Sequence, residues 1–414
     1  MDDHVICPYL WNHQNIDTEG KVAPCCNAYM YEEWTKLDFN DKIDTPLHKR
    51  TRQEMIQGNF PEVCSVCRVD ENEGVQSARE RAIEQFGLPI DLNKSKITFL
   101  DIAYSNTCNL ACVMCKPSDS SIIEEAFRDK RGEDIPHYLH TLKANAPWMK
   151  WNDFARSQEK VVYTKQLIEE GLQLLKVTGG EPTACKYFLE VIDWSIENNY
   201  AKNLSLRFTT NATKFNKKLI EKMKKFKSIT VNVSIDGTDN VYNYIRHHGN
   251  FDKVKENLYL IKNFKNEMKD DPKKVKITMA TVLQFYNMFE MPALAKLATD
   301  IGASINIDVN LKPEDHEFDI KFAPIEFKEK LISDCEQILR YYNYHWSISK
   351  FQNVIKYAEK VKDYKVKESD WKKLFESTRA LDKLNNKKVE DFLPTPISNY
   401  IIRRNDYNTY NYKF

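Results

Sequence analysis

Three closely spaced cysteines are the residues of this sequence most suited to metal chemistry. Cys108, Cys112 and Cys115 follow a C-x3-C-x2-C spacing directly after an apolar, β-branched run. Three thiolates on one tight loop can bind three irons of a 4Fe–4S cube, which normally takes four cysteine ligands. No fourth cysteine lies nearby in the sequence, so one iron would stay open for a small molecule, as in catalytic metal sites. A closed zinc loop is the competing interpretation.

A second group of cysteines lies near the start of the sequence. Cys7 and the pair Cys25–Cys26 flank a turn, and a β-hairpin around that turn would bring them close together in space. Cys64 and Cys67 form a CxxC pair farther along the chain. Four thiolates from two separated pairs can close around an iron–sulfur cluster or a zinc ion. We expect the ligands to be Cys7, Cys25, Cys64 and Cys67, with Cys26 in reserve.

Six β-branched runs, each followed by a segment with helical spacing, would position the three-cysteine loop. The runs are KITFLDIAYS, LQLLKVTGG, NLSLRFTTN, SITVNVSIDG, KVKITMATVL and SINIDVNLK. Apolar strands between helices indicate a parallel sheet covered on its outer face, and six units suit a partial barrel. We therefore predict an α/β fold with a partial (β/α)6 TIM-like barrel over 97–340. A small β-hairpin and helix region over 1–80 would precede it, and a helical extension with an irregular tail over 341–414 would follow.

The three-cysteine loop after the first predicted strand resembles the signature of the radical S-adenosylmethionine (SAM) superfamily. The resemblance implies that the open iron chelates the amino and carboxylate groups of SAM. One electron from the cluster would then break a carbon–sulfur bond, and the resulting deoxyadenosyl radical would abstract a hydrogen atom from the substrate. Met114 stands where this family usually has an aromatic residue near adenine, and methionine is a soft apolar side chain that can serve there.

Motifs after the next predicted strands are also similar to those of this family. VTGGEP resembles its GGE motif, TTNAT resembles its TNG element with alanine in place of glycine, and SIDG is followed by an arginine and a glycine. The forked guanidinium of Arg246 would contact the SAM carboxylate. By this resemblance the SAM-binding residues are Met114, Gly179, Gly180, Glu181, Asn211, Ser234, Arg246 and, against adenine, Val282.

The N-terminal cysteine set resembles the auxiliary-cluster region known as SPASM or twitch. In that subgroup the region usually follows the barrel, whereas here it precedes the barrel, and the further cysteines of the full SPASM pattern are missing. The shorter set points to a twitch-like region with one auxiliary Fe–S cluster, either 4Fe–4S or 2Fe–2S. That cluster would accept an electron from the substrate or bind the substrate directly.

The charge balance and the hydropathy of the sequence bear on whether the protein binds nucleic acid or a membrane. The chain has 61 basic and 60 acidic residues, which gives no sign of nucleic acid or of an acidic membrane surface as partner. No apolar run reaches the length of a membrane span, and the start lacks a signal-peptide pattern, so we expect a cytoplasmic protein with reduced thiols.

The resemblance implies an enzyme of the oxidoreductase or maturase type. We favour modification of a peptide or protein substrate, with a reductant such as flavodoxin or ferredoxin supplying the electron. Oxidation or rearrangement of a small sugar or nucleotide is the first alternative. A non-enzymatic zinc-binding scaffold is the second, because clustered cytosolic cysteines also suit structural zinc.

Overall fold

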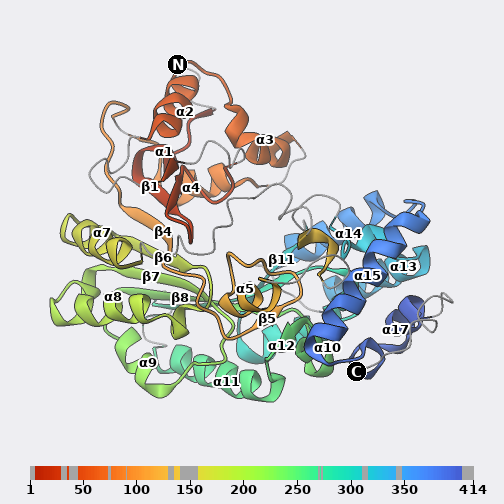
Figure 1. Ribbon diagram of the computed structural model, residues 1–414. Helices are drawn as coiled ribbons and strands as arrows, with labels where there is room; N and C mark the ends of the chain where they lie inside the picture. The colour runs from red at the N-terminus through yellow and green to blue at the C-terminus, as the bar shows by residue number, and fades with distance from the viewer. Residues whose placement is uncertain are drawn as a thin grey trace. The chain divides into compact units, whose positions relative to one another are not determined.

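The computed structural model describes residues 5–28, 35–36, 45–72, 76–89, 91–128, 135–139, 157–268, 271, 274–309, 316–341 and 347–402 (Figure 1). Contacts within the chain group it into two compact units. The first comprises Met1–Thr107, Trp151–Thr209 and Glu221–Ile229, and the second comprises Cys108–Lys150, Thr210–Ile220 and Thr230–Phe414.

A nine-stranded sheet forms the centre of the described part of the chain, in the order β11-β10-β8-β7-β6-β4-β1-β2-β3. Six of its strands coincide with the six predicted runs, and their bounds are β4 Phe99–Ala103, β6 Leu174–Thr178, β7 Ser205–Thr210, β8 Ser228–Ser234, β10 Val275–Val282 and β11 Ser304–Asp308. Strand β6 pairs in parallel with both β4 and β7, and β10 pairs in parallel with β11. The predicted α/β class with a largely parallel sheet is confirmed.

Helices alternate with these strands, as expected for a partial barrel. Helix α7 (Ser157–Glu169) precedes β6, and α8 (Lys186–Glu197) follows it; both lie against this part of the sheet (Figure 1). After the later strands come α9 (Lys217–Met223), α10 (Asp239–Ile245), α11 (Phe251–Glu267), α12 (Met291–Ile301) and α13 (Ile325–Tyr341).

The two faces of the strands differ in burial. In β6, β7 and β8, buried apolar residues alternate with partly exposed residues that are mostly polar. Leu206 and Phe208 show the buried set, and Arg207 and Thr209 the other. Since successive side chains point to opposite faces, one face of these strands is packed with buried apolar side chains and the other is less buried.

The N-terminal hairpin joins the barrel sheet directly. Strands β1 (His13–Ile16) and β2 (Lys21–Ala23) pair antiparallel, as predicted, and β2 also pairs with β3 (Thr35–Lys36). Strand β1 also pairs in parallel with β4, so the hairpin extends the sheet at that edge. Cys7 does not lie on a hairpin arm as expected, because the run after it first forms the short helix α1 (Tyr9–Asn12).

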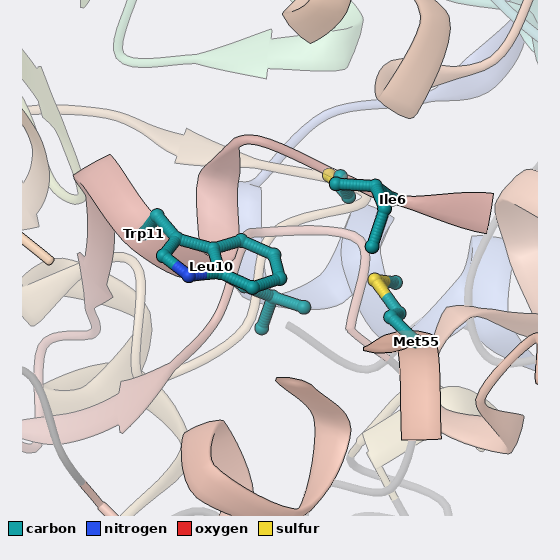
Figure 2. Packing of buried hydrophobic residues seen from close by; sticks show 5 residues of the cluster. Ile6, Leu10, Trp11 and Met55 are labelled. Carbon is teal, nitrogen blue, oxygen red and sulfur yellow. The ribbon is translucent and has the colours of Figure 1, made fainter. Parts of the chain in front are cut away.

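Three further helices pack around this hairpin region: α2 (Pro46–Ile56), α3 (Ser65–Asn72) and α4 (Ala78–Phe86). Figure 2 shows one buried cluster, in which Ile6, Leu10 and Trp11 pack with Met55 of α2. Burial of these large apolar side chains stabilises the region, at about 1.5–3 kcal/mol for each fully buried side chain.

The C-terminal region is helical, as predicted. After α13 come α14 (Ile348–Lys360), α15 (Glu368–Asn385), α16 (Val389–Phe392) and α17 (Thr395–Ile402). The tail predicted to be irregular, from 403 onward, lies outside the described residues. No helix in the described ranges is both long and apolar enough to cross a membrane.

Candidate functional site

Backbone pairing fixes the three-cysteine loop. The short strand β5 (Ala111–Cys112) pairs antiparallel with β9 (Arg246–His247), and Cys112 lies opposite Arg246. The N–H of Val113 donates to the Ile245 carbonyl at 2.9 Å, and the N–H of Cys115 closes a turn onto the Cys112 carbonyl at 3.0 Å. The loop is therefore held by main-chain bonds that do not depend on its thiols.

One thiol of this loop lies in a setting that favours its thiolate. Cys112 and Cys115 are hydrogen-bonded through their side chains, and this bond lowers the pKa of Cys112, where burial opposes the shift and Arg246 reinforces it. The same bond, together with burial, raises the pKa of Cys115. The N–H of Cys108 donates to Ser121 Oγ at 3.2 Å, at the start of α5 (Ser121–Phe127). A lowered pKa favours the thiolate, which is the form that binds metal.

The grouping of possible metal ligands also bears on sites for a single metal ion. No three His, Cys, Asp or Glu side chains among the described residues stand close enough together to hold one metal ion. Cysteines on an iron–sulfur cube each bind a different iron, so they stand farther apart than the ligands of one ion. This observation therefore leaves the cluster prediction for the three-cysteine loop untested.

Arg246 is paired within the protein. Its Nη2 lies 2.6 Å from Asp236 Oδ2, both side chains are buried, and its Nη1 lies 3.7 Å from Cys112 Sγ. Asp236 Oδ1 also accepts from the Val282 N–H at 2.8 Å. Arg246 Nε is buried and has no hydrogen-bond partner among the described residues, so one donor of this side chain stays available for an anionic group. This donor fits the predicted contact to a SAM carboxylate.

The glycine turn after β6 packs on the residue that precedes the cysteine loop. Gly179 and Gly180 have φ values of +72° and +52°, and a Cβ atom on Gly180 would lie 2.2 Å from the Thr107 carbonyl oxygen. The N–H of Glu181 donates to that same oxygen at 2.7 Å. The buried Glu181 carboxylate accepts from the N–H and hydroxyl of Thr183. Glycine is required here by both conformation and space.

Asn211 reaches the cysteine loop from the end of β7. Its Nδ2 donates to Asn109 Oδ1 at 3.1 Å, and its own Oδ1 accepts from the Thr213 hydroxyl at 2.7 Å. The next residue, Ala212, has φ +58°, a conformation that favours glycine. The alanine therefore occupies the position where the resembling motif has glycine, and it keeps the backbone shape that glycine allows.

The other three predicted SAM contacts are partly exposed at the expected places. Ser234 ends β8, Val282 ends β10, and Met114 lies inside the cysteine loop. Since Asp236 holds both Arg246 and the Val282 backbone, the ends of β8 and β10 are linked within the second unit. A contact of these residues with adenine or ribose stays a prediction.

The five N-terminal cysteines gather around the hairpin region. Cys7 is part of the cluster in Figure 2, Cys25 packs against a second buried cluster, and Cys64 packs against both. Cys67 is buried and interacts electrostatically with Cys7 and Cys25, whereas Cys26 is exposed. Burial raises the pKa of Cys7 to about 12. None of these five cysteines is in a disulfide, so the set is available for metal binding.

Two residues that no sequence motif singled out hold these loops in place. Tyr138 donates its hydroxyl to the Cys115 carbonyl at 3.0 Å. In the first unit, the buried Lys160 of α7 donates to three carbonyl oxygens, those of Asp17 and Thr18 in the hairpin turn and of Ala103 at the end of β4, at 2.8–2.9 Å. Neither lies in a recognisable pattern, because each role depends on contacts distant in sequence.

Comparison with known proteins identifies the class of the domain. Residues 102–297 match the model of the Radical SAM superfamily, and this range includes the cysteine loop and every predicted SAM contact. The chain thus contains a radical SAM domain. The N-terminal cysteine set lies outside the matched range.

Individual relatives are distant. The chain is 24% identical to the mycofactocin maturase MftC of Mycolicibacterium smegmatis over 241 residues, which is 58% of this chain and 50% of that protein. It is 26% identical to a GTP 3',8-cyclase of Clostridium botulinum over 166 residues, 40% of this chain and 43% of the cyclase. The chain thus spans about half the length of the curated relatives it matches. Among solved structures, Streptococcus suis SuiB bound to S-adenosylmethionine aligns with 81% of this chain and 70% of its own, at 17% identity and a TM-score of 0.38.

Proposed function

We propose that this chain cleaves SAM reductively at a 4Fe–4S cluster held by Cys108, Cys112 and Cys115, and abstracts a hydrogen atom from its substrate. The observation that carries the proposal is the loop inside the radical SAM domain, with Arg246 held beside Cys112. When bound, the cluster and SAM supply a carbon radical that removes hydrogen from unactivated positions.

The protein's own groups would bind and orient SAM. Arg246 Nε offers a donor for the SAM carboxylate, and Asp236 keeps its guanidinium fixed. Gly179 and Gly180 let the turn after β6 take its positive-φ shape, and backbone carbonyls of this turn would accept from the methionine amino group. Burial of Cys112 and of the Arg246–Asp236 pair excludes water from this side of the loop.

An auxiliary iron–sulfur cluster bound by Cys7, Cys25, Cys64 and Cys67 is part of the proposal. Its support is that packing and electrostatic contacts bring these thiols together around two buried clusters. The exposed Cys26 is the alternative to Cys25. A cluster here would take up an electron from the substrate or bind the substrate directly.

For the substrate we propose a peptide or protein. The relative MftC carries the name of a maturase, which supports this choice. The match to GTP 3',8-cyclases favours a nucleotide as the second candidate. The two candidates differ in a simple assay, since GTP can be added directly to the reconstituted protein.

Anaerobic reconstitution tests the proposal. The protein is loaded with iron and sulfide, given SAM and dithionite, and assayed for deoxyadenosine, iron content and EPR signals of the reduced clusters. We expect deoxyadenosine and two clusters per chain from the wild type. Cys112→Ala should abolish deoxyadenosine and remove one cluster, whereas Cys7→Ala should remove the other cluster. Cys335→Ala, a buried cysteine of α13, is the matched control and should change neither.

Three results would contradict parts of this proposal. Zinc without iron in the purified protein would support the scaffold alternative. Full cluster loading with no deoxyadenosine from the wild type would exclude SAM cleavage under these conditions. An increase in deoxyadenosine on addition of GTP alone would replace the peptide substrate with a nucleotide.

A further inference from the structure

A row of four polar side chains crosses neighbouring strands of the first unit. Asn15 of β1 pairs with Asp101 of β4, Asp101 pairs with Lys176 of β6, and Lys176 pairs with Arg207 of β7. Partners in register on parallel strands point to the same face of the sheet. The four side chains therefore share one face, opposite the face that carries the buried Phe208.

The polar row carries one more positive than negative charge. Lys176 Nζ lies 2.6 Å from Asp101 Oδ2, with the side chains 19% and 2% exposed. Burial opposes the ammonium form of Lys176, but the Asp101 carboxylate outweighs it and raises the pKa of Lys176. Arg207 adds a second cation on the neighbouring strand, so two cations face one carboxylate.

Two polar atoms of this row lack partners within the described part of the chain. Asp101 Oδ1 and Arg207 Nε are both buried there without a hydrogen bond, and the Asp101 side chain as a whole is almost fully buried. An unpaired buried acceptor or donor destabilises the folded chain, because it has given up its hydrogen bonds to water without replacing them. One acceptor and one donor on the same face, with spare positive charge, are what a bound anion carrying an N–H group would satisfy.

Two side chains of this row are partly exposed, and the row precedes the glycine turn in the first unit. Lys176 and Arg207 are partly exposed, as are Thr178 and Thr209 on the same face. Lys176 lies three residues before Gly179, about 10 Å along the strand direction. A group bound here would stand below the glycine turn that follows β6.

We propose that Arg207 and Lys176 bind a carboxylate of the substrate, while Asp101 positions Lys176 and accepts from an N–H next to that carboxylate. That the bound group is the substrate rests on the proposed function. A carboxylate brings one negative charge and neutralises the row, whereas a phosphate dianion would leave excess negative charge beside the buried Asp101. Guanidinium forks and carboxylates also match in geometry.

The test uses N-acetylglycine, which carries one carboxylate next to one amide N–H. Its affinity for the full-length reconstituted protein is measured by saturation-transfer NMR at constant ionic strength. Inorganic phosphate and neutral N-methylacetamide are titrated in parallel. We expect N-acetylglycine to bind more tightly than either. Arg207→Gln should weaken its binding roughly tenfold or more, as expected for loss of a hydrogen bond to a charged group.

Lys276→Gln is the matched control, because Lys276 is an exposed lysine on β10 and the change removes the same charge. Its affinity for N-acetylglycine should equal that of the wild type. Equal affinity of Arg207→Gln and the wild type would overturn the proposal. Tighter binding of phosphate than of N-acetylglycine would also overturn it, in favour of a phosphate-bearing substrate.

Two further measurements keep the outcomes distinct. If circular dichroism shows that Arg207→Gln does not fold, Arg207→Lys takes its place, since it keeps the charge and loses the fork; unchanged affinity there overturns the role of the fork. Binding is measured without SAM, so it does not depend on SAM cleavage. Absence of deoxyadenosine from the loaded wild type would refute the proposed function alone, and carboxylate binding that ignores Arg207 would refute this inference alone.

Discussion

Gly180→Ala would test how tightly the glycine turn after β6 packs against Thr107. A Cβ atom at this position would lie 2.2 Å from the Thr107 carbonyl oxygen, far inside normal contact. The two backbone segments would have to separate by about 1 Å to reach ordinary packing distances. The hydrogen bond from the Glu181 N–H to that oxygen would be lost with the separation.

The expected loss of stability follows from four contributions. An L-residue at φ +52° costs about 1–2 kcal/mol, and reduced freedom of the unfolded chain returns about 0.4–1 kcal/mol. Relief of the clash costs about 1–3 kcal/mol, and the lost hydrogen bond about 0.5–1.5 kcal/mol. We therefore expect Gly180→Ala to lower the free energy of unfolding by about 1.5–6 kcal/mol.

Gly58→Ala is the matched control. Gly58 has φ +83°, but no atom of the described residues lies within 4 Å of the position that a Cβ would take there, so only the conformational cost applies, about 1 kcal/mol. Both variants and the wild type are compared by urea denaturation with circular dichroism. If Gly180→Ala is destabilised no more than Gly58→Ala, the close approach of the turn to Thr107 has no energetic weight and the reasoning is wrong.

Three further perturbations have definite expectations. Asp236→Asn leaves the buried Arg246 without its counter-charge and should cost about 3–5 kcal/mol in urea denaturation. Tyr138→Phe removes the bond to the Cys115 carbonyl and should cost about 1 kcal/mol while speeding loss of iron to a chelator. Burial lowers the pKa of His316 to about 4, against about 6.5 unfolded. The free energy of unfolding should therefore be highest above pH 6.5, where His316 is neutral in both states. It should fall by about 3 kcal/mol as the pH drops from 6.5 through 4. The variant His316→Phe should show a smaller dependence of stability on pH over this range.

Controls for these variants come from exposed or distant sites. Lys253→Gln breaks an exposed ion pair with Glu256 and should change stability by less than about 1 kcal/mol. Tyr163→Phe removes a buried hydroxyl bond to Gln14 in the first unit and should leave iron release unchanged. Similar losses for Asp236→Asn and Lys253→Gln would show that burial of the Arg246 pair carries no weight.

The strands could be located from the sequence because the alternation of apolar and polar residues follows the burial of each strand's two faces. In β8 the alternation of Ile229, Val231 and Val233 with polar residues marks a strand with one buried face. The parallel pairing of β1 with β4 was not predicted. Local alternation states that a strand exists, but it does not say which edge of which sheet the strand joins.

The candidate site was predicted as motifs but not as contacts. The order of the cysteine loop, the GGE turn and Asn211 along the chain was enough to place them at strand ends. The pairing of Arg246 with Asp236 could not be read from the sequence, since it depends on how β9 pairs with β5. The polar row from Asn15 to Arg207 likewise depends on strand register, because its members are scattered over four strands.

The three hydrogen bonds made by Lys160 affect whether the N-terminal hairpin could be transferred to another protein. Its buried ammonium group donates to carbonyls of both the hairpin turn and the end of β4. If either segment moved away, the buried charge would lose hydrogen bonds without gaining contact with water. We therefore expect the hairpin turn and the end of β4 to open together during unfolding. The N-terminal hairpin therefore cannot be transferred alone. A chimera with another barrel would also need this lysine and its three carbonyl acceptors.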